Sequence, residues 1–183
     1  PGLFPLNPVG HDLGAQSFGE FSDYFSALAR EKGGAYAFEG LKRVEAPPDI
    51  DMHLLAHVVG DVLYTQKGLE GIQICTEDFR NACSHSIVIG LFSEQGEAAL
   101  PKIATACYQA PGGSGAYTMC FHGLGHGILA YAGYNLEKAV ELCKKTGTSQ
   151  YGYEESSQCI SGSVMEIISG GAHDLKLWAS QRK

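Results

Sequence analysis

The feature that most constrains the fold of this chain is a repeated pattern of cysteines. Three of them each open an apolar, helix-like segment: Cys83, Cys120 and Cys159. The other three each close a segment of a second kind: Cys75, Cys107 and Cys143. The openers are 37 and 39 residues apart, and an opener without cysteine fits at Asp51, 32 residues before Cys83. Self-similarity at such a period is typical of repeat architectures, so the chain is predicted to be built from similar units.

Each unit is predicted to be a pair of α-helices, A followed by B, because apolar residues recur at helical rather than strand spacing. Cap residues agree: Asn135 precedes an amphipathic segment, and Gly147 follows Lys144 and Lys145. The expected fold class is therefore all-α, an array of helical-hairpin repeats similar to an α-solenoid. A loop is expected over Gly112–Ala116.

Two regions are expected along the chain. Residues 1–50 are predicted to form an extended N-terminal arm and a capping helix, whose apolar face includes Phe18, Phe21, Phe25 and Leu28. Residues 51–183 are predicted to form about four A/B helix pairs, the last B helix lying within 173–183 and anchored by Trp178.

Six cysteines at regular spacing predict three disulfides. Local pairing, which the spacing favours over the other connectivities, would staple each B helix to the next A helix: Cys75–Cys83, Cys107–Cys120 and Cys143–Cys159. Disulfides indicate an extracytoplasmic protein, secreted or periplasmic; the alternative is a cytosolic protein with free buried thiols. The chain starts at Pro1 rather than Met, which fits removal of a signal peptide.

Charge and hydropathy exclude several partners. The chain has 13 Lys and Arg against 20 Asp and Glu, a net charge of −7, and no basic run. Nucleic acid and anionic membrane surfaces are therefore not expected partners. The longest apolar stretches, such as residues 86–92, are too short to cross a bilayer.

The repeat resembles a known family. The seven residues between Cys75 and Cys83, and the phrase Asn-Leu-Glu-Lys-Ala-Val-Glu-Leu-Cys that ends at Cys143, are similar to disulfide-rich Sel-like repeats, relatives of tetratricopeptide repeats. The resemblance covers roughly residues 51–180. It implies an α-solenoid that acts as a scaffold and binds a peptide or protein in its concave groove.

Five of the seven histidines fall on two positions of the repeat, two and six residues after an opener: His53, His57, His85, His122 and His126. Positions four apart share one helix face, so such a pair can chelate one transition-metal ion. Packed A helices ~8–10 Å apart would bring these faces together. Helix N-termini disfavour imidazolium, and the neutral ring is the form that binds metal. The alternative is that the histidines are hydrogen-bonded core residues, placed alike because the repeats share an ancestor.

Four further residues are candidates for the same site. Met165 occupies the second histidine position in the last repeat, where a thioether would favour copper; core filling is the alternative. Glu166 is the nearest carboxylate and a candidate ligand or catalytic general base, although it lies about 100° around the helix from Met165. Tyr131 and Tyr134 lie one and two turns beyond His126 and are candidate pocket residues.

Alternate glycines separate and follow the second histidine pair, at Gly123, Gly125 and Gly127. Each costs a helix ~1 kcal/mol relative to alanine, so a compensating role is expected. Either neighbouring helices pack closely there, or the glycines leave open space for a ligand.

Two hypotheses of function follow. The first is an extracytoplasmic, histidine-rich metal-binding protein; with an open coordination position it would be a metal-dependent enzyme, either a zinc hydrolase or a copper oxidoreductase. Copper and zinc are the favoured metals, with iron or a noncovalently bound haem as alternatives. The absence of His-Glu-x-x-His excludes a standard zincin. The second hypothesis is a non-catalytic Sel-like scaffold, and a small-molecule or peptide ligand is compatible with either.

Overall fold

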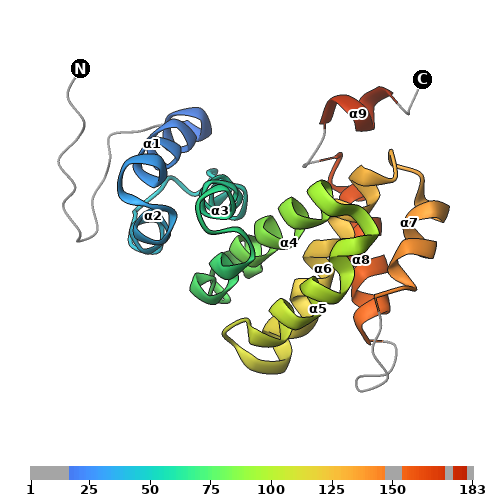
Figure 1. Ribbon diagram of the computed structural model, residues 1–183. Helices are drawn as coiled ribbons and strands as arrows, with labels where there is room; N and C mark the ends of the chain where they lie inside the picture. Colours follow the sequence, from blue (N-terminus) through green and yellow to red (C-terminus); the bar gives the residue numbers. More distant parts are fainter. Residues whose placement is uncertain (1–16, 147–153, 172–174, 181–183) are drawn as a thin grey trace.

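A computed structural model describes residues 17–146, 154–171 and 175–180 (Figure 1). The described residues are mainly helical and include no extended strand, which confirms the all-α class. The α-helices are α1 (Phe18–Lys32), α2 (Gly34–Leu41), α3 (Met52–Lys67), α4 (Ala82–Gln95), α5 (Leu100–Gln109), α6 (Gly113–Tyr131), α7 (Leu136–Cys143), α8 (Glu154–Ile168) and α9 (Leu175–Ser180). Three 3₁₀ segments join them: η1 (Gly68–Ile74), η2 (Asp78–Asn81) and η3 (Gly96–Ala99).

The N-terminal helix forms where its sequence predicts. Ser17 and Glu20 make a reciprocal capping box, in which the Ser17 hydroxyl accepts from the Glu20 amide and the Glu20 carboxylate accepts from the Ser17 amide. Phe21 and Phe25 are buried on the face that packs against α2 and α3. The expected N-terminal arm, residues 1–15, lies outside the described residues.

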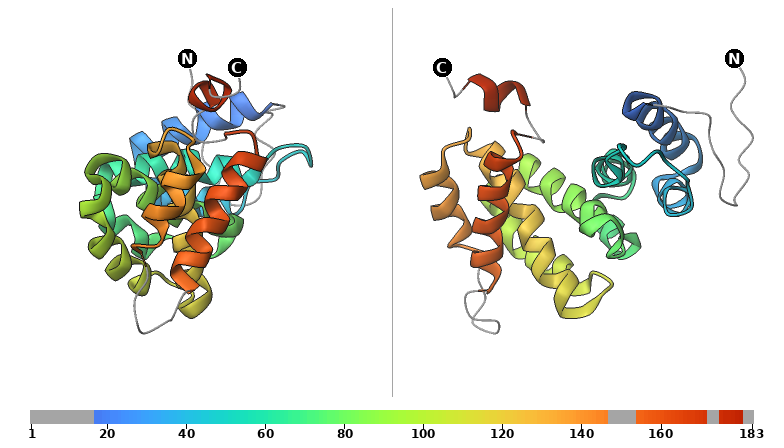
Figure 2. Two further views of the ribbon diagram at one scale, coloured as in Figure 1. Left: turned by 90° about the vertical axis from the view of Figure 1, so that its right-hand side faces the viewer. Right: turned by 180° about the vertical axis from the view of Figure 1, so that it is seen from behind.

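Helices α3, α4, α6 and α8 lie side by side in chain order, each in contact with the next (Figures 1 and 2). The intervening segments pack against this row: η1 against α3 and α4, α5 against α6, and α7 against α6 and α8. The helix α9 falls within the segment expected to hold the last helix. The row brings the predicted A-helix faces next to one another.

Two local predictions are wrong. Gly113–Ala116 is the first turn of α6 rather than a loop, because Gly112 caps the helix at φ 114° and Ala116 and Tyr117 are buried. Burial here outweighs the low helix propensity of glycine. The segment that ends at Cys75 is a 3₁₀ helix rather than an α-helix, since Gly68 turns the chain at φ 55° and leaves only a short piece before the disulfide.

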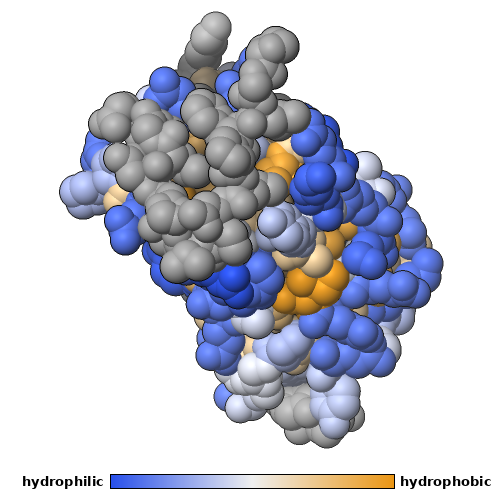
Figure 3. Space-filling view, turned by 90° about the vertical axis from the view of Figure 1, so that its left-hand side faces the viewer, coloured by the Kyte–Doolittle hydropathy of each residue, from blue (hydrophilic) through white to orange (hydrophobic). Residues whose placement is uncertain are grey.

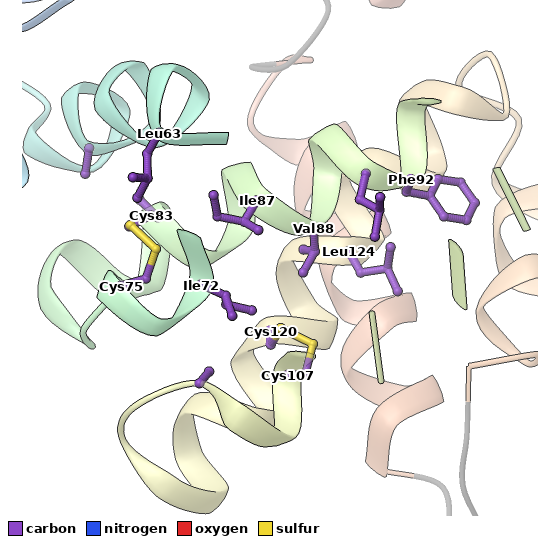
Figure 4. Packing of buried hydrophobic residues seen from close by; sticks show 14 of the residues in the cluster. Leu63, Ile72, Cys75, Cys83, Ile87, Val88, Phe92, Cys107, Cys120 and Leu124 are labelled. Carbon is purple, nitrogen blue, oxygen red and sulfur yellow. A yellow bond between two sulfur atoms is a disulfide. The ribbon is translucent and has the colours of Figure 1, made fainter. Parts of the chain in front are cut away.

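All six cysteines are bonded, with the pairing expected from their spacing: Cys75–Cys83, Cys107–Cys120 and Cys143–Cys159. Figure 4 shows the first two beside the buried side chains of Ile72, Ile87 and Leu124. Three buried disulfides are compatible with a protein outside the cytoplasm.

The alternate glycines of α6 serve close packing, not open space. A β-carbon at Gly123 would lie 2.3 Å from the ring of His85 on α4. On the side that faces α8, a β-carbon at Gly125 would lie 1.9 Å from the carbonyl oxygen of Cys159. Gly162 of α8 is equally close to the carbonyl oxygen of His122. Glycine therefore lets the backbone of α6 contact the His85 ring on α4 and the backbone of α8 directly. This close packing brings the histidines of α4 and α6 together.

One face of the molecule is mainly hydrophilic where its described residues are seen (Figure 3). In Figure 3 the apolar atoms of this face are confined to small areas. Among the described residues, no helix is both long and apolar enough to cross a membrane.

Candidate metal centre

The five histidines of the repeat register come together in one group, here called the histidine cluster: His53, His57, His85, His122 and His126. His85 lies at its centre. Its ring centroid is 5.9 Å from those of His53 and His57, 6.0 Å from that of His122 and 6.1 Å from that of His126. Within the pairs, the centroids are 4.8 Å apart on α3 and 5.2 Å apart on α6. The buried ring of α4 is thus almost equidistant from the four flanking rings.

Hydrogen bonds fix the tautomers of the first pair. His53 Nδ1 lies 2.7 Å from the carbonyl oxygen of Phe79, which can only accept, so Nδ1 carries the proton. His57 Nδ1 lies 2.9 Å from the Ser86 hydroxyl, and that hydroxyl donates its own proton to the carbonyl of His57. The Ser86 oxygen therefore accepts from Nδ1. In both rings the lone pair is on Nε2, the nitrogen left for a ligand.

An unusual turn supplies the carbonyl that orients His53. Phe79, Arg80 and Asn81 have φ angles of 54°, 54° and 62°, three consecutive non-glycine residues in the left-handed region. Each such residue costs of order 1–2 kcal/mol, and strain of this kind clusters at functional sites. The turn lies inside the loop closed by Cys75 and Cys83. The disulfide and the strained turn together present the Phe79 carbonyl to His53.

The first pair and His85 have the arrangement of a three-histidine site. One ring nitrogen from each of His53, His57 and His85 lies within 4.8 Å of the other two. Metal–nitrogen bonds of ~2.0–2.1 Å separate two ligands of a tetrahedral ion by about 3.4 Å, so small side-chain rotations would close the site. These three residues could hold a metal ion.

The buried ring of His85 lacks hydrogen-bond partners within the part of the chain that the structure describes. Its side chain is 2% exposed, and neither Nδ1 nor Nε2 has a hydrogen-bond partner there. Leaving a buried polar group unpaired costs roughly 1–3 kcal/mol. A bound ion would remove that cost.

The cluster opens to solvent beside His53. This side chain is half-buried, whereas the other four rings are buried. An open depression of the surface is lined by residues 48–53 with Phe79 and Arg80. A small molecule or an ion can approach the first pair from this side.

The second pair has a carboxylate behind it. His126 Nδ1 lies 2.8 Å from Glu166 Oε2, and the Tyr134 hydroxyl donates to Oε1 at 2.9 Å. Glu166 is fully buried, so a substrate cannot reach it in this structure. Its contacts are those of a residue that orients His126, with the Nδ1 proton held by the carboxylate and the lone pair on Nε2.

Met165 approaches the other histidine of this pair. Its sulfur lies 3.3 Å from His122 Nε2, and 42% of the residue is exposed. The angular offset between Met165 and Glu166 does not keep the carboxylate away: α8 packs so closely on α6 that each side chain reaches one histidine. Tyr131 is placed elsewhere, half-exposed with its ring 5.1 Å from that of Phe92.

Burial favours the neutral form of His53, His85 and His122 by lowering the pKa of each ring. It lowers the pKa of His85 well below its usual 6.5, and the four neighbouring histidines lower it further. Burial, His126 and His53 lower the pKa of His122 to about 4. Burial also lowers the pKa of His53, against the opposing effect of the Phe79 carbonyl. Neutral imidazole is the state that binds metal ions.

Two contributors had no clear signal in the sequence. The Phe79 carbonyl depends on a left-handed turn that no glycine marks. Ser86 lies three residues after Cys83, and the corresponding positions after Cys120 and Cys159 are Gly123 and Gly162. All three contact the preceding A helix closely. For Ser86, the one hint in the sequence was that a small residue recurs three positions after each of these cysteines.

Comparisons of the chain with protein-family models, curated proteins and solved structures found no match. The fold and the site therefore define its class: an all-α, disulfide-bonded protein with a histidine cluster able to hold a metal ion. Function is argued from this geometry.

Proposed function

We propose that this protein binds a transition-metal ion, copper or zinc, through His53, His57 and His85. The observation that carries the proposal is the convergence of three ring nitrogens, with Nδ1 of the first two already occupied as a donor. Metal-ligating histidines almost always use their second ring nitrogen in this way. His85 adds a buried ring without a hydrogen-bond partner among the described residues.

The alternative, that these are ordinary core histidines, explains less. A core histidine is normally satisfied by hydrogen bonds on the ring nitrogens that it buries. His85 instead places both nitrogens among four other imidazoles, where no carboxylate or carbonyl within the described segments meets them. The arrangement costs stability in the absence of an ion and is accounted for by one.

The donor set favours borderline metals. Imidazole suits zinc, copper, iron and nickel, while thiolate ligands are unavailable because every cysteine is in a disulfide. A haem is a poorer fit, because Gly123 brings α6 against the ring of His85 and leaves no room for a porphyrin between α4 and α6. Among single ions, copper and zinc remain the favoured choices.

Three protein ligands leave a coordination position open, and the surface depression beside His53 is the direction from which it can be filled. Zinc in such a site lowers the pKa of its bound water to ≈ 7 and supports hydrolysis. Copper would support electron transfer to or from a small substrate. We therefore propose a metal-dependent enzyme, whose reaction class follows from the metal.

We also propose that the chain is an extracytoplasmic repeat protein of the Sel-like type. One supporting observation is the row of α3, α4, α6 and α8. Another is that a disulfide joins each of α4, α6 and α8 to the segment before it. The third is the recurrence of histidine at the same positions. In this proposal the helical array holds the histidine cluster in place. The competing hypothesis is a Sel-like scaffold that binds a peptide or protein and no metal.

The test is metal analysis of protein produced in an oxidising compartment without chelator or affinity histidines. We expect at least one copper or zinc per chain, and one equivalent fewer in His53→Gln and His57→Gln variants that keep their helical circular dichroism. The same exchange at His11, outside the histidine register, is the control. After cobalt(II) substitution, the visible spectrum reports whether coordination is three-histidine with an added water. Metal-free protein that cannot be reconstituted would contradict the proposal and favour the scaffold.

A further inference from the structure

We propose a second metal position, formed by His122, His126 and Met165, that shares His85 with the first. It rests on the proposed function only in that His85 is taken as a ligand there as well. Its own donors lie on α6 and α8, whereas His53 and His57 of the first site lie on α3.

The first argument is the spacing of His122 and Met165. Their Nε2 and Sδ atoms are 3.3 Å apart. With metal–nitrogen bonds of ~2.0 Å and metal–sulfur bonds of ~2.3 Å, two ligands of a tetrahedral ion are about 3.5 Å apart. The pair therefore already has the separation of two donors on one ion. A thioether donor selects a soft metal, copper(I) above all.

The second argument is that a hydrogen bond to Glu166 orients His126 and sets its tautomer. Glu166 accepts the Nδ1 proton at 2.8 Å and is itself held by the Tyr134 hydroxyl. This carboxylate–histidine pair places the ring proton on Nδ1 and the lone pair on Nε2, and it raises the basicity of the ring. The full burial of Glu166 keeps water from competing for that hydrogen bond.

The third argument is the position of His85. Its ring is 5.9 Å from both rings of the first pair and 6.0–6.1 Å from both rings of the second. Both of its nitrogens are buried, and no partner for either lies within the described residues. One ion would use one nitrogen; two ions, one on each side, use both. The remaining ring proton leaves to solvent as the second ion binds, so that His85 becomes a bridging imidazolate.

The bridge fixes how the two ions can cooperate. With bonds of ~2.0 Å at both nitrogens the ions are about 6 Å apart, wider than the 3.5–4 Å of two-metal hydrolytic centres. A single water cannot span that gap, so the ions are coupled through the ring. Each has its own access, the first beside half-buried His53 and the second beside Met165, which is 42% exposed.

The test titrates the metal-free protein with copper(II) and follows it by electron paramagnetic resonance. Two coppers per chain are expected, with the signal of the doubly loaded protein largely lost through exchange coupling across His85. The full signal should return when the protein is denatured in acid, which distinguishes two coupled copper(II) ions from copper(I), which is silent in electron paramagnetic resonance. In His85→Gln, coupling disappears and any copper that still binds gives an uncoupled signal of full intensity. Two coppers with undiminished wild-type intensity would overturn the bridge.

A second variant avoids the buried core. Met165→Leu removes the sulfur at an exposed position, and Ile168→Leu, at 80% exposed on the same helix, is its matched control. Competition with a copper(I) chelator is expected to show the second copper weakened by roughly tenfold or more in Met165→Leu only. One copper per chain that depends on His53 but not on Met165 or His126 overturns the second site and leaves the proposed function standing. No bound copper or zinc at all overturns both.

Discussion

The imidazole of His85 lies directly on the backbone of Gly123, so close that a β-carbon at residue 123 would come within 2.3 Å of ring atom Cδ2 and 2.8 Å of the His85 α-carbon. This contact sets the separation of α4 and α6 and places the central ring of the cluster between the two histidine pairs. The glycine is thus part of the site without carrying a donor atom.

Gly123→Ala is therefore expected to destabilise the protein and displace His85. The clash involves the ring and the backbone of His85, and overpacking of this kind costs ~1–3 kcal/mol, more than the ~1 kcal/mol that alanine gains over glycine in a helix. The free energy of unfolding in urea and the metal content should both fall. Gly115→Ala on the same helix is the control, because its β-carbon meets nothing nearer than 3.7 Å. Equal behaviour of the two variants would contradict the proposed role of Gly123.

Glu166→Gln tests whether the carboxylate acts through His126. The exchange removes the charged acceptor of the Nδ1 proton, and loss of such a partner typically costs 10–100-fold in metal affinity. Copper affinity should fall by that factor with little change in helical content. Glu155→Gln is the matched control: Glu155 is also fully buried on α8 and accepts from a tyrosine, Tyr117 at 2.8 Å. If both variants kept full affinity, the positioning role of Glu166 would be wrong.

Much of the fold could be predicted because its determinants are local. The helical spacing of apolar residues from Phe18 to Leu28 indicated α1, and the cysteine spacing indicated the disulfide pairing. The repeated histidine positions indicated that the A-helix faces carry one site, and the structure brings all five rings together. These features depend on periodicity along the chain, which sequence displays directly.

The features of the fold and the site that could not be predicted depend on long-range packing and on backbone angles. Met165 and Glu166 both reach α6 only because Gly125 and Gly162 let α8 approach so closely. The left-handed run that begins at Phe79 has no glycine to announce it. The first turn of α6 is helical despite its glycines because Ala116 and Tyr117 are buried. Each of these is decided by tertiary contacts rather than by local propensity.

The disulfide Cys75–Cys83 is expected to matter more for metal binding than its short loop implies. Replacing both cysteines by alanine should cost ~2–3 kcal/mol and free the turn that presents the Phe79 carbonyl to His53. Metal content of the first site should then fall. Alanine at both Cys143 and Cys159 is the control, since that bridge lies at α7 and α8, away from the first pair. Thermal unfolding and metal analysis of the two double variants decide the point, and equal metal loss would argue for a general effect of stability.

The metal-free protein is expected to lose stability in mild acid. Burial holds the pKa of His122 at about 4 and also lowers those of His53 and His85, whereas an exposed histidine in the unfolded chain titrates near 6.5. Below 6.5 the unfolded chain takes up protons that the folded protein does not, so unfolding becomes more favourable as the pH falls. The stabilisation is complete above 6.5 and disappears as the pH falls through the folded-state values, about 4 for His122.

The pH dependence of the free energy of unfolding can be measured and assigned to individual histidines. Each histidine that is protonated only in the unfolded state contributes up to ~1.4 kcal/mol per pH unit. Urea unfolding between about pH 7.5 and pH 4.5 should show the free energy of unfolding fall, and His122→Gln should flatten the curve by about one proton. Bound metal should steepen it, because the ion competes with protons for the same nitrogens. A free energy of unfolding that stayed constant across this range would mean that the histidines of the cluster are protonated as readily in the folded protein as in the unfolded chain.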